Sequence, residues 1–348
     1  MTCARRLGSG AGVGQDVRSI TSRIAVRPAD RKVMLAVSGP GPPRPAAFSE
    51  VPMTRSRWTL PAALVVALGL AAPLATVPAS QGAVAAQTVT TRMGTYNIRA
   101  GVSTATFERA VRDLATRVDV AGLQEVNHRD KEAVLANLPG FGYFRPARGY
   151  GEQNPVIWDS SRFTKLSATH RRLSARTYIG NELGRPGQYV APIFSAVVRL
   201  RDDTTRQRLT VVNVHLTPGA VYGGNPVPGR PRVWRLFTRQ IANLMDVVAA
   251  EKRSAKVFVT GDFNVGWVAD ERTRRTKLPF MSFRRQSFAS NWATRHDWNR
   301  GTHSKSLIDQ VWTNQRAATA SVIFSMGYSD HYPGIGTYQL PVATTTAG

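Results

Sequence analysis

One stretch of the chain, Val257–Val265 (V-F-V-T-G-D-F-N-V), places two chemically capable side chains directly after an apolar run. The β-branched and aromatic residues up to Thr260, ended by Gly261, predict a buried strand. Asp262 and Asn264 follow at positions i and i+2, which an extended chain points to the same side. Open α/β sheets bind ligands beyond the carboxyl ends of their strands, so the pair is a candidate site. A simple Asx turn that caps the strand is the alternative.

Further carboxylate, carboxamide and imidazole groups occupy comparable positions elsewhere. At or just beyond the ends of expected strands stand Asn97, Glu125, His215, Asp330 and His331, and Asp309 lies within a strand. Taken singly, each has a plain structural explanation, because a histidine that ends an apolar strand is more often hydrogen-bonded than catalytic. Together with Asp262 and Asn264, however, they predict four carboxylates, two amides and two histidines at one edge.

The elements that must position these residues begin with a βαβ-like unit. The segment Arg92–Arg99 reads as a short strand. Apolar residues then recur at helical spacing over Thr104–Arg117, with Thr104 or Thr106 as the N-cap. The segment Val118–Leu123 is the next strand, so the polar residues that follow the two strands would lie at the same edge.

Downstream segments predict the rest of an α/β domain. The β-rich runs Ile193–Leu200 and Leu209–Leu216 form an expected hairpin. A second amphipathic helix over Val233–Val248 leads to the strand that precedes Asp262. Short strands are expected at 156–158, 307–312, 322–324 and 336–340, and loops at 140–151, 217–231 and 272–285. Residues 165–192 are expected to form a long loop with some extended structure.

The first 86 of the 348 residues differ in composition from the remainder. Residues 1–52 are rich in Gly, Pro, Ala and Arg and lack apolar periodicity, so we expect them to be disordered or to lie upstream of the true start. Residues 53–86 have the layout of a secretory signal peptide, with two arginines, an apolar stretch and small residues before a cleavage site near Ala85 or Ala86.

A membrane anchor is the alternative for this segment. The apolar stretch Leu60–Val77 is short of the ~20 residues that a spanning helix needs, and Pro73 interrupts it. We therefore expect a secreted protein without a membrane span, in which residues 87–348 form one domain.

Charge and cysteine content limit the function of the expected mature chain. From residue 87 onward it has 36 Lys and Arg against 19 Asp and Glu, a formal net charge of +17. The full sequence has a single cysteine, Cys3, which lies before residue 87. The expected mature chain therefore has no cysteine, and export would require no disulfide. A basic surplus of this size favours polyanions such as nucleic acid, anionic lipid or cell-wall polymer. Solubility and a compositional bias toward arginine are the alternative explanation.

Six motifs now fall into an order that resembles a known family. They are T-Y-N-I, L-Q-E-V, N-V-H-L-T-P, T-G-D-F-N, L-I-D-Q-V-W and S-D-H-Y-P-G. They resemble the successive motifs of the endonuclease/exonuclease/phosphatase superfamily, which includes deoxyribonuclease-I-like enzymes, over about residues 91–340. The resemblance implies a four-layer α/β sandwich, in which two mixed β-sheets pack face to face and helices flank them.

The resemblance also implies a role for each candidate residue. Glu125 would be the principal ligand of Mg²⁺ or Mn²⁺, supported by Asn97, and Asp330 would bind or position the metal. Asp309 would orient His331, Asp262 and Asn264 would face the attacking water and the phosphoryl oxygens, and His215 would contact the phosphate. Glu152 is similar to the acid that pairs with that histidine in deoxyribonuclease-I-like members. Hard oxygen ligands suit Mg²⁺, which keeps several waters.

These observations predict a secreted, metal-dependent phosphodiester hydrolase, expected to be a monomeric nuclease. Hydrolysis needs an activated water and stabilisation of charge on phosphoryl oxygens, and either His331 or Asp262 could accept the proton. A lipid or inositol phosphate phosphodiesterase or phosphatase is the alternative on the same scaffold. A non-catalytic binder is a third possibility, which the complete motif set disfavours.

Overall fold

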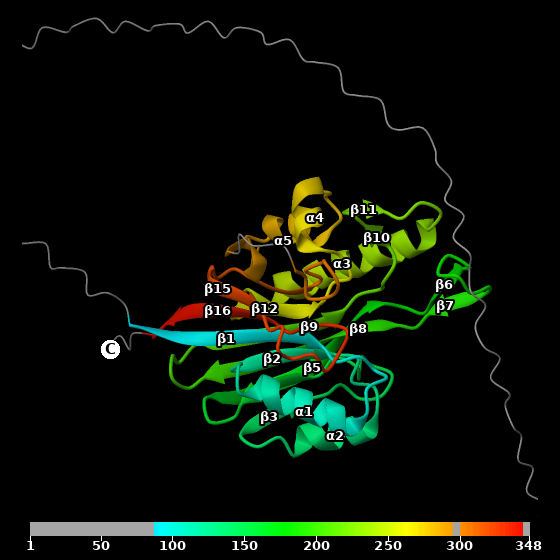
Figure 1. The fold of residues 1–348 in the computed structure, drawn as a ribbon. Coiled ribbons are helices and arrows are strands. Elements are labelled where there is room, and N and C mark those ends of the chain that lie inside the picture. The colour runs from blue at the N-terminus through cyan, green and yellow to red at the C-terminus, as the bar shows by residue number, and fades with distance from the viewer. Residues whose placement is uncertain (1–86, 295–299, 344–348) are drawn as a thin grey trace, which may run out of the picture. The chain divides into compact units, whose positions relative to one another are not determined.

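Two six-stranded mixed sheets face each other in the computed structural model, which describes residues 87–294 and 300–343 (Figure 1). The first sheet has the order β15 (Ala317–Val322), β16 (Gly334–Pro341), β1 (Thr88–Asn97), β2 (Val120–Gln124), β4 (Val156–Asp159) and β3 (Phe141–Phe144). The second has the order β13 (Ala289–Ser290), β14 (Asp309–Thr313), β12 (Lys256–Asp262), β9 (Arg208–His215), β8 (Ile193–Asp202) and β5 (Phe163–Ser174). The predictions for residues 1–86 lie outside the described residues.

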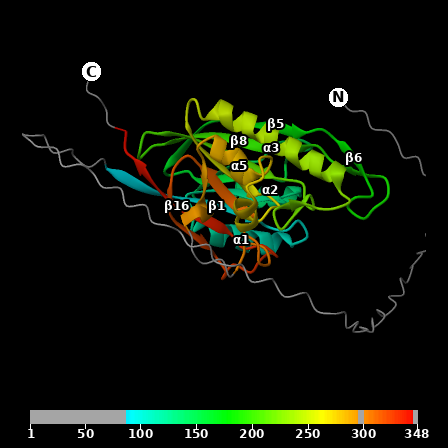
Figure 2. The same ribbon diagram turned by 90° about the horizontal axis from the view of Figure 1, so that it is seen from above.

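Helices cover the outer faces of both sheets. Figures 1 and 2 show α1 (Thr104–Ala115) and α2 (Arg129–Ala136) on the first sheet, and α3 (Pro231–Glu251) with α5 (Pro279–Arg285) on the second. The short elements are α4 (Trp267–Thr273), a 3₁₀ turn (Asn291–Thr294), the pair β6 (Thr177–Gly180) and β7 (Gln188–Val190), and the pair β10 (Val221–Tyr222) and β11 (Asn225–Pro226). The expected four-layer sandwich is confirmed.

Three buried apolar clusters hold the layers together. Between the sheets, residues such as Phe258 and Tyr338 pack edge to face with ring centroids 5.0 Å apart. Outside the first sheet, Phe107 and Leu114 of α1 are fully buried against it, and α3 buries Phe237 in the same way against the second. These helices present one apolar stripe each, which the sheets remove from water.

A polar bridge joins the two sheets just beneath the strand ends. The amide of Gln124 on β2 donates to Oδ1 of Asn213 on β9 over 2.7 Å, and Asn213 in turn donates to the backbone oxygen of Leu123 over 2.7 Å. Gly122 permits this close approach, because a Cβ there would overlap Asn213 and Thr260. The bridge fixes the spacing of the sheets where the candidate residues gather.

Strand register brings those residues side by side. Parallel pairing of β12 with β9 places Asp262 opposite His215, and antiparallel pairing of β12 with β14 places Asp262 opposite Asp309. In the first sheet, β1 and β2 are parallel, with Asn97 opposite Gln124. The carboxyl ends of four strands and the start of β14 therefore meet at one edge.

Several predicted boundaries were wrong. Residues 165–192, expected to be a long loop with some extended structure, contain more strand than that: most of the twelve-residue strand β5 and the β6–β7 pair. The expected loop at 140–151 contains β3. The basic segment 272–285 contains α5, and the expected strand at 322–324 is only the end of β15. Helix α1 is capped by Ser103, whose side chain accepts from the backbone N–H of Thr106.

Within the described residues, none of the helices is both long and apolar enough to span a membrane.

Candidate active site

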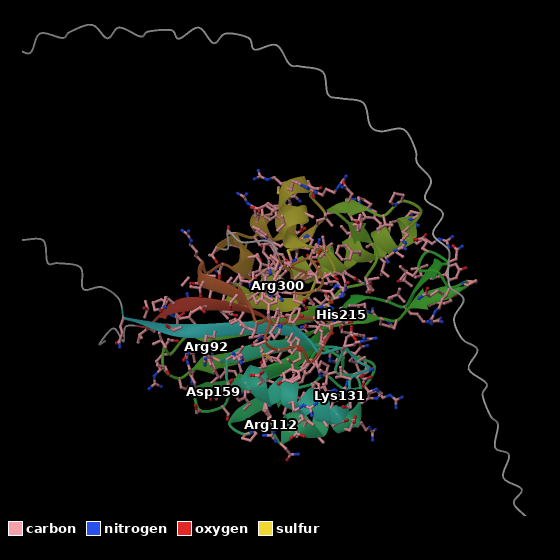
Figure 3. All side chains as sticks on the ribbon, in the orientation of Figure 1. Arg92, Arg112, Lys131, Asp159, His215 and Arg300 are labelled. Atoms are coloured by element: carbon pink, nitrogen blue, oxygen red, sulfur yellow. The ribbon has the colours of Figure 1, made fainter. Side chains whose placement is uncertain are left out.

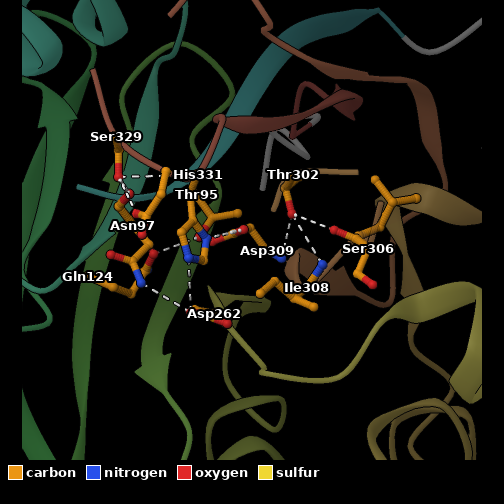
Figure 4. Close-up of polar contacts among 12 residues, drawn as sticks. Thr95, Asn97, Gln124, Asp262, Thr302, Ser306, Ile308, Asp309, Ser329 and His331 are labelled. Atoms are coloured by element: carbon orange, nitrogen blue, oxygen red, sulfur yellow. Dashed lines mark hydrogen bonds and ion pairs between the residues drawn. The ribbon is translucent and has the colours of Figure 1, made fainter. Parts of the chain in front are cut away.

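The candidate site lies at the shared edge of the two sheets. The residues that the structure gathers there are Asn97, Glu125, His215, Asp262, Asn264, Asp309, Ser329, Asp330 and His331. Figure 3 places His215 among the strand ends, and Figure 4 shows the contacts that join Asn97, Asp262, Asp309 and His331.

Glu125 and Asn97 form an oxygen-rich corner of the site. The Asn97 amide donates to Oε1 of Glu125 over 3.0 Å, and the backbone N–H of Ala100 donates to Oε2 over 2.8 Å. Burial raises the pKa of Glu125, but these hydrogen bonds outweigh it and hold the pKa below its ordinary value. Glu125 also has a positive φ of 64°, a strained conformation for a residue other than glycine.

This corner fits a divalent cation. Oδ1 of Asn97 is buried and has no hydrogen-bond partner among the described residues, while the amide nitrogen of the same side chain is fully engaged. An ionised carboxylate beside an unpaired amide oxygen is the kind of hard donor set that Mg²⁺ or Mn²⁺ prefers. The donor chemistry thus agrees with the metal roles predicted for Glu125 and Asn97.

His331 and Asp309 form a buried pair. Nδ1 of His331 lies 2.8 Å from Oδ2 of Asp309, which is fully buried. Thr302 fixes the carboxylate's strand, since its hydroxyl accepts from the backbone N–H of Asp309 over 3.1 Å. Burial lowers the pKa of His331, but the charge and hydrogen bond of Asp309, and then Asp262, raise it to about 9. The imidazole is therefore held as a cation near neutral pH.

Asp262 stands at the centre of the cluster. Its Oδ2 accepts from the Asn97 amide over 3.1 Å and lies 3.4 Å from Nε2 of His215 and 4.0 Å from Nε2 of His331. Its Oδ1 accepts from the backbone N–H of Asn264 over 2.9 Å. Burial and the charge of Asp309 raise the pKa of Asp262, and the two histidines partly oppose this.

A second way of holding a cation exists in the same cluster. Ligand atoms of Asp262, Asp309 and His331 lie within 4.8 Å of one another, and all three residues are buried. The hydrogen bond between Asp309 and Nδ1 of His331 already occupies one of these atoms. The three side chains are therefore better suited to positioning a proton on His331 than to binding a cation.

The remaining predicted residues lie at the rim. Asp330 is half exposed, and its Oδ2 lies 3.9 Å from Nε of Arg99; no hydrogen bond or ion pair joins it to Glu125 among the described residues. Glu152 forms an ion pair with Arg145 at 3.7 Å instead of pairing with His215, although Glu152 and His215 line the same hollow. Their predicted roles stay predictions.

The structure adds residues that the motifs did not single out as functional. Ser329 donates to the backbone oxygen of Asn97 over 2.9 Å and accepts from the backbone N–H of Arg99 over 3.1 Å, so it ties the S-D-H loop to the end of β1. His303 packs on His331 with ring centroids 4.5 Å apart. Only the position of Ser329 directly before Asp330 could have suggested its role; His303 carries no local signal.

Comparison with known proteins agrees with this geometry. The model of the Endonuclease/Exonuclease/phosphatase family matches residues 94–331, about two thirds of the chain. The chain belongs to this family. Its members are hydrolases of phosphate esters that typically use divalent metal ions, and the chain is accordingly a family phosphoesterase. No curated protein matches the sequence.

Solved structures of family members share the fold. A family protein from Bacteroides thetaiotaomicron superposes with a TM-score of 0.54 at 13% identity, covering 73% of this chain and 99% of that one. A mannosyl-6-phosphatase of the same organism superposes with a TM-score of 0.53 at 13% identity, covering 72% of this chain and 99% of that one. A humanized TDP2 of D. rerio superposes with a TM-score of 0.53 at 13% identity, covering 72% of this chain and 98% of that one. At such identities the likeness concerns the fold alone.

Proposed function

We propose that this phosphoesterase is a secreted nuclease that uses Mg²⁺ or Mn²⁺ to cleave phosphodiester bonds in DNA or RNA. The observation that carries the proposal is the arrangement of two facing groups around Asp262. On one side lies the oxygen corner of Glu125 and Asn97, and on the other the buried pair of His331 and Asp309. A phosphate bound between them would meet positive charge from both groups, with Asp262 as the proton acceptor.

The chain's own residues divide the chemistry between them. A cation held by Glu125 and Asn97 would supply charge for the phosphoryl oxygens. His331, kept protonated by Asp309, donates a hydrogen bond to a phosphoryl oxygen from Nε2. Asp262 accepts the proton of the attacking water, and its raised pKa makes it a stronger base than an exposed aspartate. His215, 3.4 Å from Asp262, faces the same phosphate.

Charge supports a nucleic acid as the substrate. The region from residue 87 onward has a formal net charge of +17, and neutralisation of phosphates supplies much of the affinity for nucleic acids. Beside the site lies a hollow of about 870 Å³, which is lined by His128, Arg129, Arg145 and Arg148 together with Glu132 and Glu152. Its two exposed arginines, Arg129 and Arg148, would contact the backbone of a bound strand beside the cut phosphate.

The experiment is hydrolysis by the purified chain from residue 87 onward. DNA and RNA gels, with Mg²⁺ or with EDTA, test cleavage, and sphingomyelin and inositol phosphates are assayed in parallel. We expect nucleic acid to be cleaved and EDTA to abolish cleavage. Faster turnover of the lipid or inositol phosphates would replace the proposal with the alternative substrate class.

Glu125→Gln provides the sharpest test of the metal site. The variant keeps the size of the side chain but removes its charge, so we expect hydrolysis to fall by at least about 10²-fold and Mn²⁺ binding by calorimetry to weaken. Glu108→Gln, a partly exposed position on α1 that pairs with Arg112, is the matched control. Wild-type activity of Glu125→Gln across a Mg²⁺ titration would contradict the role of Glu125.

A further inference from the structure

A tight hairpin projects beside the candidate active site. Its strands β10 and β11 pair Val221 with Pro226 and Tyr222 with Asn225. Between them stand Gly223 and Gly224 with φ values of 57° and 79°. Two consecutive residues with positive φ are the signature of a type I′ turn, which favours glycine at both positions.

The hairpin is held rigidly against α4. The hydroxyl of Thr273 donates to the backbone oxygen of Gly224 over 3.2 Å, and Nη2 of Arg275 donates to Oδ1 of Asn225 over 2.6 Å. A Cβ on Gly224 would come within 2.5 Å of the backbone oxygen of Ala269, so the tip lies directly on the helix. Two of the four turn residues, Gly224 and Asn225, are thus held in place.

Tyr222 is the turn residue whose side chain these contacts leave exposed to solvent. It is 84% exposed, whereas the other exposed tyrosines, at positions 150, 178 and 189, are 46–49% exposed and their rings pack on other side chains. Among the described residues, Tyr222 makes no side-chain hydrogen bond, ring contact or cation–π contact. A large aromatic ring that is left in water on a rigid support is available to a ligand.

Tyr222 lines a hollow that also reaches Asn264 of the candidate site. This hollow of about 310 Å³ is lined by residues of the turn, including Tyr222 and Gly224, and by Asn264. Its volume falls within the roughly 300–1,000 Å³ that small-ligand sites occupy. Asn264 connects it to the centre, because the backbone N–H of Asn264 donates to Asp262 over 2.9 Å.

We propose that Tyr222 stacks on a nucleobase next to the phosphodiester that is cut. This inference rests on the proposed nuclease function and names the residue that would hold one flank of the substrate. Every base offers a flat π-face, so such stacking is tolerant of sequence. The glycine turn and the contacts with α4 would keep the ring in place before the substrate arrives, which lowers the entropy cost of binding.

The test uses oligonucleotides that carry 2-aminopurine, a base whose fluorescence is quenched by stacking, at single positions around the cleavage site. Binding is measured in EDTA with wild-type protein, Tyr222→Ala, Tyr222→Trp and, as a matched control, Tyr189→Ala. We expect quenching at one position beside the cut, its loss in Tyr222→Ala, and its retention in Tyr222→Trp and Tyr189→Ala. In steady-state cleavage with Mg²⁺, KM of Tyr222→Ala should rise about tenfold, the scale of one stacked base.

The outcomes separate the two proposals. Wild-type protein that cleaves nucleic acid, together with a Tyr222→Ala variant that quenches and cleaves like wild type, would overturn the stacking inference alone. Wild-type protein that neither binds nor cleaves DNA or RNA would overturn the proposed function, and the stacking inference with it. An equal rise of KM in Tyr189→Ala would also contradict a specific role for Tyr222.

Discussion

At the scale of single residues, His331 and Asp309 share one hydrogen bond of 2.8 Å in a buried setting. Residues that serve the same step are strongly non-additive, because the loss of either disables it. We expect His331→Ala to lower kcat/KM by about 10²–10⁴-fold, the range for a positioned acid or base. Asp309→Ala should cost somewhat less, and the double variant little more than His331→Ala. Plasmid and oligonucleotide substrates provide the measurement.

Additive losses would show that the two residues act separately. Each residue would then have a separate structural role. The Asp309 carboxylate would support its strand, and the His331 imidazole would support the S-D-H loop. The family membership would be unaffected, since it does not depend on this pair. Circular dichroism and thermal unfolding of each variant distinguish lost chemistry from lost structure.

Residue types and strand ends were enough to expect some of these side chains at a common edge. Asp262 and Asn264 follow an unmistakable apolar strand, and Glu125 follows another, so their common edge could be expected. Contacts between the two sheets could not be expected in the same way. The hydrogen bond from the Asn97 amide to Asp262 joins residues 165 positions apart and depends on how the sheets pack. No local pattern specifies that packing.

At the scale of elements, the missed strand β5 shows where sequence patterns fail. Its sequence, F-T-K-L-S-A-T-H-R-R-L-S, does not alternate between polar and apolar residues. β5 is the edge strand of its sheet, and its middle residues are largely exposed, so burial imposes no period of two. Central strands such as β9 and β12 are buried on both faces and were recognised as apolar runs.

The link between α4 and α5 leads to a prediction about stability. Asp270 of α4 is 1% exposed, its Oδ2 accepts from the backbone N–H of Phe280 over 2.8 Å, and its Oδ1 has no partner among the described residues. Burial raises the pKa of Asp270 to about 7, which the hydrogen bond from Phe280 only partly opposes. The folded protein therefore keeps this carboxyl protonated at pH values where the unfolded chain has ionised it.

The direction of the pH effect follows from this difference. Below about pH 4 both states are protonated and Asp270 contributes no penalty; between pH 4 and 7 the free energy of unfolding falls, and above pH 7 the full penalty of roughly 4 kcal/mol remains. Asp270→Asn should remove this decline and stabilise the protein at pH 8 much more than at pH 4.5. Urea unfolding at the two pH values, with Glu271→Gln as the control, measures it. Equal effects at both pH values would contradict the assignment.

At the scale of the whole molecule, two sheets converge on one edge because a few polar groups hold them in register. The bridge from Gln124 to Asn213 lies directly behind the strand ends that carry Asn97, Asp262 and His215. Asn213 is fully buried and satisfies its amide with the backbone oxygens of Leu123 and Pro155. Loss of these bonds would leave buried polar groups unpaired, and this makes the interior near the site intolerant of change.

We propose, finally, that residues 53–86 direct export of the protein. Cleavage near Ala85 or Ala86 would leave the described fold intact, because β1 begins at Thr88 and the backbone oxygen of Gln87 accepts from the N–H of Val342 over 2.8 Å. The chain beyond this point has no cysteine, so folding after export does not depend on disulfide formation.

Expressed from Met53 in an exporting host, the protein should therefore appear in the medium with an N-terminus near Gln87. A charged residue in the apolar stretch, Val65→Arg, should keep it inside the cell, because a signal peptide depends on an apolar core without charge. Mass spectrometry of the secreted and cell-associated fractions identifies the N-terminus in each case. A secreted protein that retains residues 54–80, or unchanged export of Val65→Arg, would show that this segment is not a cleaved signal peptide.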